Sequence, residues 1–144
     1  MHAISRHHSK YATEADAAYG AAFRKRRNEA GFSIKQVAER CGAHQSTLAR
    51  LERGEFPWHE RHQADFNEAL EELIESGTPA YVTRAQIEEI ARLRRQGLGP
   101  HRISHIVGMK WQRIRKIIDE NRYPEWTGGS IRYIKEVEPC QGIC

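Results

Sequence analysis

The stretch from residue 32 to residue 54, FSIKQVAERCGAHQSTLARLERG, constrains the fold more than any other part of this chain. Ser33 is a good helix N-cap, and apolar residues follow it at helical spacing, so a short helix is expected there. Gly42 stands where that helix must stop and the chain must turn through a positive φ, which glycine adopts at least cost. Apolar residues at helical spacing return before Gly54. The stretch therefore predicts two short helices joined by a tight turn.

This string resembles the helix-turn-helix of the lambda-repressor-like (Cro/XRE) family. The family ends its recognition helix with Leu-Glu-x-Gly, here Leu51-Glu52-Arg53-Gly54, and Gln45-Ser46-Thr47 opens the same helix. The resemblance covers roughly residues 16 to 75, and it implies that this second helix lies in the major groove of DNA. It also implies an ion pair between Arg27 and Glu52. One departure concerns a phosphate contact rather than the fold, because Ile34 stands where the family usually carries Gln.

A second set of helical signals runs from about residue 81 to residue 122. Thr83 and Gln86 make a capping-box pattern that opens one helix. A short helix then ends at Gly108, and a basic helix follows at about residues 110–120. The arrangement is similar to homeodomain-like and resolvase-like DNA-binding modules, although a three-helix bundle used for dimerisation or docking remains an alternative. The inward face of the short helix is predicted to be Ile103, Ile106 and Val107.

The fold class predicted is all-α, with two small helix-turn-helix domains joined by a short hinge. A C-terminal tail follows, in which the alternation over residues 131–137 predicts one β-strand. Because a lone strand is not stable, it would pair with a second copy, pack as an extended arm or stay disordered, and the sequence leaves these open. The predicted pieces are a flexible N-terminal arm (1–15), the first domain (16–76), the hinge (77–80), the second domain (81–122) and the tail (123–144).

Charge is distributed unevenly along the chain, whose net charge is +4. Residues 1–57 hold ten Lys/Arg against six Asp/Glu, and residues 81–122 hold ten against four. Residues 58–80 hold one basic residue and six acidic ones. Charge runs are often only solvated faces, but two basic runs that each coincide with a helix-turn-helix candidate favour a polyanionic partner. We expect the acidic helix at about residues 60–76 to face away from DNA or to pack on a partner.

Residues that start a recognition helix point at base edges, while neighbouring cations contact phosphate. Gln can pair with adenine and Arg with guanine, each contributing about 1–3 kcal/mol of discrimination. For Trp111 a core anchor is as good an interpretation as a base contact. The predicted base-reading residues are Gln45, Ser46, Ala49, Arg50, Lys110, Trp111, Gln112 and Arg115. The predicted phosphate contacts are His44, Thr47, Arg102, Arg113 and Lys116.

Other kinds of site are weakly supported by the sequence. His101 and His105 have the spacing of two metal ligands but no third ligand, and Cys140 and Cys144 lack a second pair. No catalytic motif, cofactor loop or small-molecule effector site is evident. No membrane span or signal peptide is evident either, and three cysteines suit a reducing cytoplasm. We expect a non-enzymatic, cytoplasmic, nucleoid-associated protein without metal or cofactor, and a homodimer is possible.

The function that these patterns favour is sequence-specific regulation of transcription through double-stranded DNA. Repression is favoured over activation because it requires only occupancy of a promoter. A small, two-headed reader of this size is similar to regulators of phages, plasmids, other mobile elements or bacterial operons. The alternatives are a DNA-architecture or recombination accessory protein, and an antitoxin-like module that holds a protein partner with its acidic helix.

Overall fold

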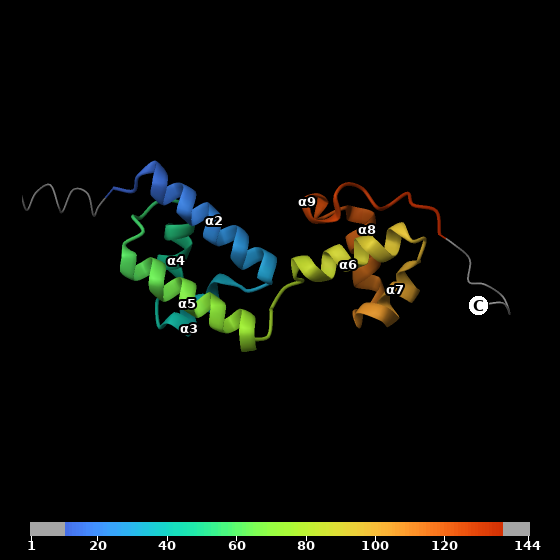
Figure 1. Ribbon diagram of the computed structural model, residues 1–144, viewed down its shortest axis with the longest axis horizontal. Helices are drawn as coiled ribbons and strands as arrows, with labels where there is room; N and C mark the ends of the chain where they lie inside the picture. Colours follow the sequence, from blue (N-terminus) through green and yellow to red (C-terminus); the bar gives the residue numbers. More distant parts are fainter. Residues whose placement is uncertain (1–10, 137–144) are drawn as a thin grey trace, which may run out of the picture. The chain divides into compact units, whose positions relative to one another are not determined.

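The computed structural model describes residues 11–136, and every regular element in that range is an α-helix, which confirms the all-α prediction (Figure 1). The chain divides into two compact units, Met1–Thr83 and Arg84–Cys144. The first unit contains α2 (Glu14–Ala30), α3 (Ile34–Cys41), α4 (Gln45–Glu52) and α5 (Glu60–Ser76). The second contains α6 (Arg84–Arg95), α7 (Pro100–Val107), α8 (Trp111–Glu120) and α9 (Pro124–Thr127).

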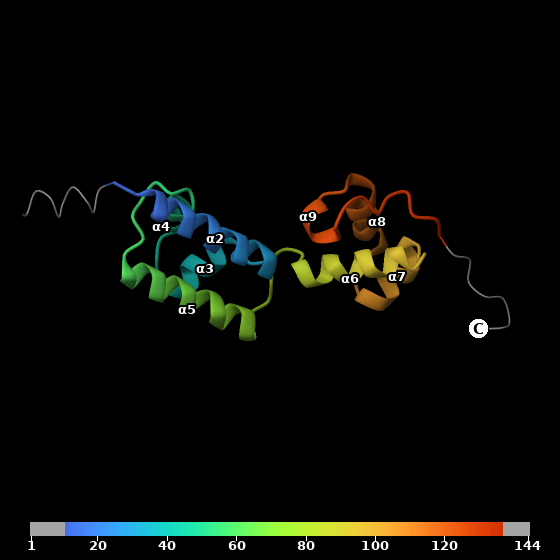
Figure 2. The same ribbon diagram turned by 45° about the horizontal axis from the view of Figure 1, so that its top comes forward.

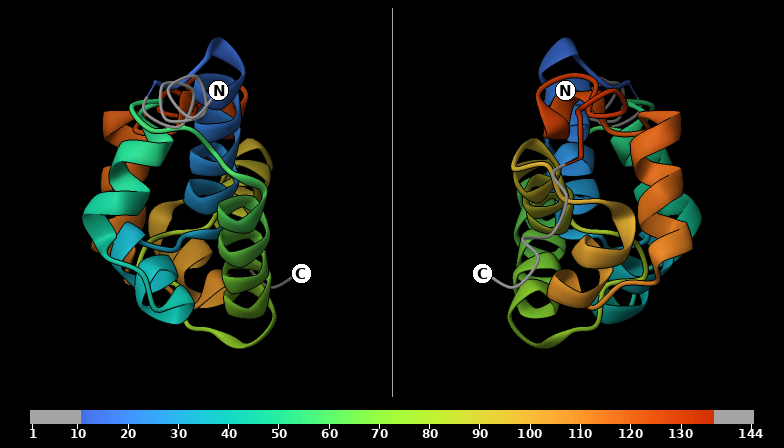
Figure 3. Two further views of the ribbon diagram at one scale, coloured as in Figure 1. Left: turned by 90° about the vertical axis from the view of Figure 1, so that its left-hand side faces the viewer. Right: turned by 90° about the vertical axis from the view of Figure 1, so that its right-hand side faces the viewer.

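In the first unit, α3 packs on α4 and α5, while α2 packs on α4 (Figure 2). Gly20 allows the close approach of α2, because a Cβ at this position would collide with the carbonyl oxygen of Leu51. The indole Nε1 of Trp58 donates to the same carbonyl at 2.9 Å. Figure 3 shows α4 along one side of the unit and α5 along the other. The buried core consists of Phe23, Phe32, Val37, Leu48, Leu51, Trp58, Phe66, Ala69 and Leu70.

The start of α2 is fixed by hydrogen bonds to the side chain of Asp16. Its carboxylate accepts hydrogen bonds from the amide of Thr13 and from the amide of Trp58, both at 2.8 Å. Burial opposes ionisation, but the hydrogen bonds from Thr13 and Trp58 outweigh it and hold the pKa of Asp16 below its usual value. Because Thr13 is the N-cap, α2 includes residues 14 and 15, which we predicted as part of the flexible arm. Residues 1–10 of that arm lie outside the described range.

In the second unit, α7 packs on α6 and α8, while α9 packs on α6. The predicted strand is wrong for residues 131–136, which form turn and coil, and residue 137 lies outside the described range. Instead of pairing with a strand, this segment is held by Arg94, a residue that is 6% exposed. Its guanidinium donates to the carbonyl oxygens of Ile131 at 3.0 Å and Arg132 at 3.1 Å, and to Glu136 Oε1 at 2.9 Å. Residues 131–136 are therefore an ordered part of the second unit.

Isoleucines dominate the interior of the second unit. Ile131 from the tail is fully buried there. Ile106 is the exception, since it is 56% exposed although we predicted it on the inward face of α7. The buried apolar side chains of this unit are Ile87, Ile90, Ala91, Leu93, Ile103, Ile114, Ile117, Ile118 and Ile131.

The two units repeat one spacing of helices and turns. In each, a glycine with positive φ follows the longer first helix, at Gly31 and at Gly97. Eleven positions later, a second such glycine ends an eight-residue helix. The second glycines are Gly42, with φ 74° and ψ 20°, and Gly108, with φ 73° and ψ 21°. A Cβ at either would meet no atom within 4 Å, so the backbone conformation and not lack of space favours glycine there. The third helix starts three positions after each of these glycines, at Gln45 and at Trp111.

The segment between the two units is hydrogen-bonded to the first unit. The amide of Tyr81 donates to the carbonyl oxygen of Gly31 at 2.9 Å, and Gln36 Nε2 donates to the carbonyl oxygen of Thr78 at 2.9 Å. Residues 78–81, which overlap the predicted hinge, therefore hydrogen-bond to the ends of α2 and α3. Within residues 11–136, no helix combines the length and apolar character that a membrane crossing demands.

Candidate nucleic-acid interface

A buried ion pair fixes α4 to α2. Arg27 Nε lies 2.7 Å from Glu52 Oε2 and Arg27 Nη2 lies 2.7 Å from Glu52 Oε1, so the two groups meet in a bidentate contact. Both residues are 5% exposed, and Arg27 Nη1 also donates to the carbonyl oxygen of Phe32 at 2.9 Å. The pair expected from the sequence is thus present. It joins the last turn of α2 to the last residue of α4, so the direction of α4 depends on it.

The N-terminus of α4 is capped by His44. Its Nδ1 accepts a hydrogen bond from the amide of Ser46 at 3.2 Å and lies 2.7 Å from Ser46 Oγ. The hydroxyl of Ser46 is therefore engaged locally, as is one ring nitrogen of His44. Gln45 lies between them and is exposed. Of the three residues, Gln45 is the one whose polar group is most available to an outside partner.

Arg50 is the cation of the α4 surface. It is exposed, and its guanidinium carbon lies 5.3 Å from the centre of the Phe56 ring, a cation–π distance. No ion pair to Arg50 is present among residues 11–136, so its charge is not neutralised by a nearby carboxylate. Ala49 and Thr47 are only partly exposed. The outer surface of α4 therefore presents a neutral amide and one arginine, braced by a ring that the sequence reading did not identify.

Comparison with protein families assigns this part of the chain. Residues 18–70 match the family model described as a helix-turn-helix domain. No curated protein and no solved structure matches the chain. The matched residues include α3, the turn at Gly42 and α4, so the helix-turn-helix domain is the part of the first unit that contains Gln45 and Arg50. A helix-turn-helix of this kind is typical of DNA-binding proteins.

The outer surface of α8 has more exposed cations than that of α4. Ile114, Ile117 and Ile118 anchor one side of α8 in the core, and Figure 3 shows the helix along the outer edge of its unit. Arg115 lies 3.5 Å from Asp119 in an exposed pair. A shallow hollow on this surface is lined by Trp111, Gln112, Arg115, Lys116 and Asp119. The exposed polar residues of the helix and its N-cap are Lys110, Gln112, Arg113, Arg115, Lys116, Asp119 and Glu120.

Trp111 is half-buried, and its ring packs against that of His101 of α7, with centroids 4.3 Å apart and the planes tilted by 30°. This contact ties the N-terminus of α8 to α7, so Trp111 is neither a fully buried core anchor nor a freely projecting wedge. His101 is one of the two histidines considered above as metal ligands, and its ring is engaged in this contact. Arg102, the other predicted contact on α7, is exposed.

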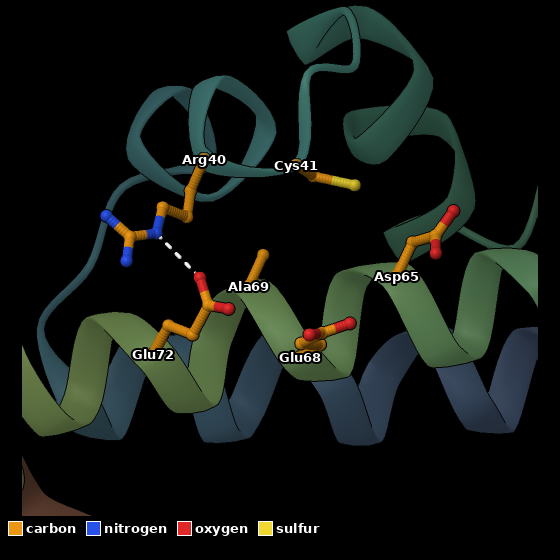
Figure 4. A pocket seen from close by; sticks show the side chains of 6 residues that line it. All are labelled: Arg40, Cys41, Asp65, Glu68, Ala69 and Glu72. Atoms are coloured by element: carbon orange, nitrogen blue, oxygen red, sulfur yellow. Dashed lines mark hydrogen bonds and ion pairs between the residues drawn. The ribbon is translucent and has the colours of Figure 1, made fainter.

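A separate hollow lies between α3 and α5 (Figure 4). Asp65, Glu68 and Glu72 line it from α5, and Arg40 Nε binds Glu72 Oε2 at 2.8 Å. Burial, together with the charges of Asp65 and Glu68, raises the pKa of the Cys41 thiol, which disfavours the nucleophilic thiolate. Residues 11–136 contain no group of three or more His, Cys, Asp or Glu side chains placed to hold a metal ion, and Cys140 and Cys144 lie outside that range.

Proposed function

We propose that this chain is a sequence-specific DNA-binding regulator of transcription in which α4 reads bases and α8 provides a second DNA contact. The observation that carries the proposal is the exposed pair Gln45 and Arg50 on the recognition helix of a matched helix-turn-helix domain, with that helix held by the Arg27–Glu52 clamp. A rigid helix is what direct readout requires, because bidentate pairs with base edges tolerate little displacement.

On α4, we assign base contacts to Gln45 and Arg50, with Ser46 and Ala49 close to the bases. Glutamine has the donor and acceptor that adenine N6 and N7 match, and arginine has the two donors that guanine O6 and N7 match. His44 and Thr47 remain the proposed phosphate contacts, His44 through the ring nitrogen that does not cap α4. The acidic α5 lies on the other side of the unit from α4, which suits a helix that must avoid DNA.

For the second unit, the proposal is a second helix-turn-helix that contacts DNA mainly through phosphates. It is supported by the repeated glycine spacing and by the exposed cations of α8. Arg102, Arg113 and Lys116 would bind phosphates, whereas Lys110, Trp111, Gln112 and Arg115 are the candidates for base contacts. The predicted limits, 16–76 and 81–122 around the hinge at 77–80, are kept here only for the two proposed DNA-contacting helix sets, since the compact units divide at Thr83 and the second includes the buried Ile131.

The finer role proposed is repression of an operon of a bacterium, phage, plasmid or other mobile element, by a cytoplasmic protein at the nucleoid. Occupancy of a promoter by two small units accounts for repression without any further surface. The direct test is selection of bound sites from a random double-stranded DNA library with the full chain, followed by footprinting. A consensus that is protected on both strands supports the proposal. Recovery of unrelated sequences with equal affinity would contradict it.

A further inference from the structure

The two units differ in what covers the eight-residue helix. In the first unit, α5 packs on α3, which buries Ala38 and brings Glu72 of α5 to Arg40. The positions of α7 that correspond to Ala38 and Arg40, counted from the following glycine, are Ser104 and Ile106. Ser104 is half-buried and Ile106 is 56% exposed. In the described part of the second unit α9 packs on α6, so no counterpart of α5 lies against α7.

The exposed face of α7 combines this apolar residue with basic or neutral polar ones. Arg102 is one helical turn before Ile106, and His105 is adjacent to it; both are exposed. The eight residues of α7, PHRISHIV, include no acidic side chain. This face therefore favours a partner helix that has an apolar residue among carboxylates.

The outer face of α5 has that composition. Ile74 is 53% exposed, and the exposed Glu71 and Glu75 lie beside it on the helix surface. Ile74 and Ile106 are the two aliphatic residues among the large apolar side chains exposed in residues 11–136, and they lie on helix faces of opposite charge. Charge complementarity therefore favours α5 of this same chain as the helix that binds the exposed face of α7.

We propose that α7 of one copy of this protein docks on α5 of a second copy, with Ile106 against Ile74 and with Arg102 and His105 facing Glu71 and Glu75. The partner is a second copy of this chain. One such contact between two short helix faces is small compared with the roughly 1,200–2,000 Å² buried in stable interfaces. Reciprocal contacts, with each copy giving its α5 and its α7, would double the buried area. The docked form is proposed for the protein free of DNA, because Arg102 is also a proposed phosphate contact.

The test is sedimentation velocity of the full chain, freed of nucleic acid, from low to high micromolar concentration. The wild type is expected to associate, and added salt should weaken the association. Ile106→Glu and the double variant Glu71→Lys/Glu75→Lys should each weaken it at least tenfold, and since all three residues are exposed, circular dichroism should show both variants folded. Tyr133→Glu, at an exposed residue that belongs to neither helix, is the matched control and should associate like the wild type.

Mixing the two deficient variants gives the sharpest result. In the mixture, the unchanged acidic α5 of Ile106→Glu meets the unchanged α7 of the double variant, so association should return. If Ile106→Glu alone still associates fully, the contact is between α5 helices or elsewhere, and the proposal is wrong. If the double variant alone still associates fully, the contact does not use the acidic face, and the proposal is equally wrong. A wild type that is monomeric throughout the concentration range also overturns it, whereas DNA binding by such a monomer would leave the proposed function standing.

Discussion

The two units have the same spacing of helices, but different types of residue occupy the equivalent buried positions that join the first helix to the third. In the first, Arg27 lies four positions before the first glycine and Glu52 ten positions after the second, and the two form a buried ion pair. In the second, the residues at those positions are Leu93 and Ile118, and both are buried. The buried arginine of the second unit is Arg94, which instead binds backbone oxygens of residues 131 and 132. The same spacing of helices is therefore compatible with either an ion pair or an apolar pair at these two buried positions. A buried guanidinium requires oxygen acceptors around it, and each unit places its arginine where such acceptors are present.

The largest effect should come from breaking the clamp of the first unit. Glu52→Ala leaves the guanidinium of Arg27 buried with the Phe32 carbonyl oxygen as its described partner, and should lower the free energy of unfolding by about 3–5 kcal/mol. Urea denaturation of the full chain measures it. Glu55→Ala, which removes an exposed pair with Arg53, should change little. An unchanged transition in Glu52→Ala would contradict the role of the clamp.

Replacing both residues of the ion pair tests whether the apolar pair of the second unit can take its place. The double variant Arg27→Leu/Glu52→Ile installs the residues of the second unit, and apolar replacement of a buried pair is often neutral or stabilising. We expect the double variant to be more stable than Glu52→Ala. If it is less stable than Glu52→Ala, the two units do not share an interchangeable solution.

Removal of the buried arginine of the second unit should have the next largest effect. Arg94→Ala leaves the carbonyl oxygens of Ile131 and Arg132 without this donor, at a cost of about 1–3 kcal/mol. Hydrogen exchange should become faster in residues 130–136. Arg92→Ala, at an exposed neighbour, is the control and should leave the tail protected. Equal exchange in Arg94→Ala and the wild type would show that other contacts hold the tail.

A smaller, pH-dependent effect is expected at the start of α2. Asp16→Ala should reduce stability by about 1–2 kcal/mol at neutral pH, because the carboxylate accepts two backbone hydrogen bonds. Since the folded state lowers the pKa of Asp16, its contribution is present above the unfolded pKa and is lost as the pH falls through the folded one, below about pH 4. Denaturation at several pH values should therefore show the variant and the wild type converging in acid. Glu14→Ala, in the same helical turn, is the control, because Glu14 accepts neither of these two hydrogen bonds.

The smallest effect per residue concerns the exposed cations of α8, where the comparison predicts phosphate contacts. Arg113→Ala/Lys116→Ala should reduce the slope of log K against log salt by nearly two units, on any DNA sequence. Arg61→Ala, at an exposed arginine of the acidic α5, should leave the slope unchanged. If the double variant retains the wild-type slope, α8 does not lie on the DNA backbone.

Local signals were enough to predict most of the helices. Ser33, Gly42 and Gly108 act within one helical turn, and the structure has helix boundaries at all three. The tail could not be predicted in the same way, because Arg94 is bound to residues 37 to 42 positions away. Alternation in residues 131–137 indicated a strand, but it is also the pattern of a segment that buries Ile131 while its neighbours stay exposed.

The candidate interface was predicted to a similar extent. Family resemblance suggested the Arg27–Glu52 pair, and helical spacing identified the exposed side of α8. The ring of Phe56 beside Arg50 was missed, because Phe56 follows the turn at Gly54 and no periodic pattern includes it. The exposure of Ile106 was missed for another reason. Helical spacing predicts one apolar face, but it does not say whether another helix is present to cover it.

Affinity for the selected site and for random DNA, measured with the same variants, tests whether α4 reads bases while α8 contacts the DNA backbone. Gln45→Ala and Arg50→Ala should each lose about 1–3 kcal/mol of binding free energy on the selected site and almost none on random DNA. Arg113→Ala/Lys116→Ala should lose equally on both. Equal losses on the two DNAs for Gln45→Ala and Arg50→Ala would contradict the claim, since α4 would then contact phosphates alone.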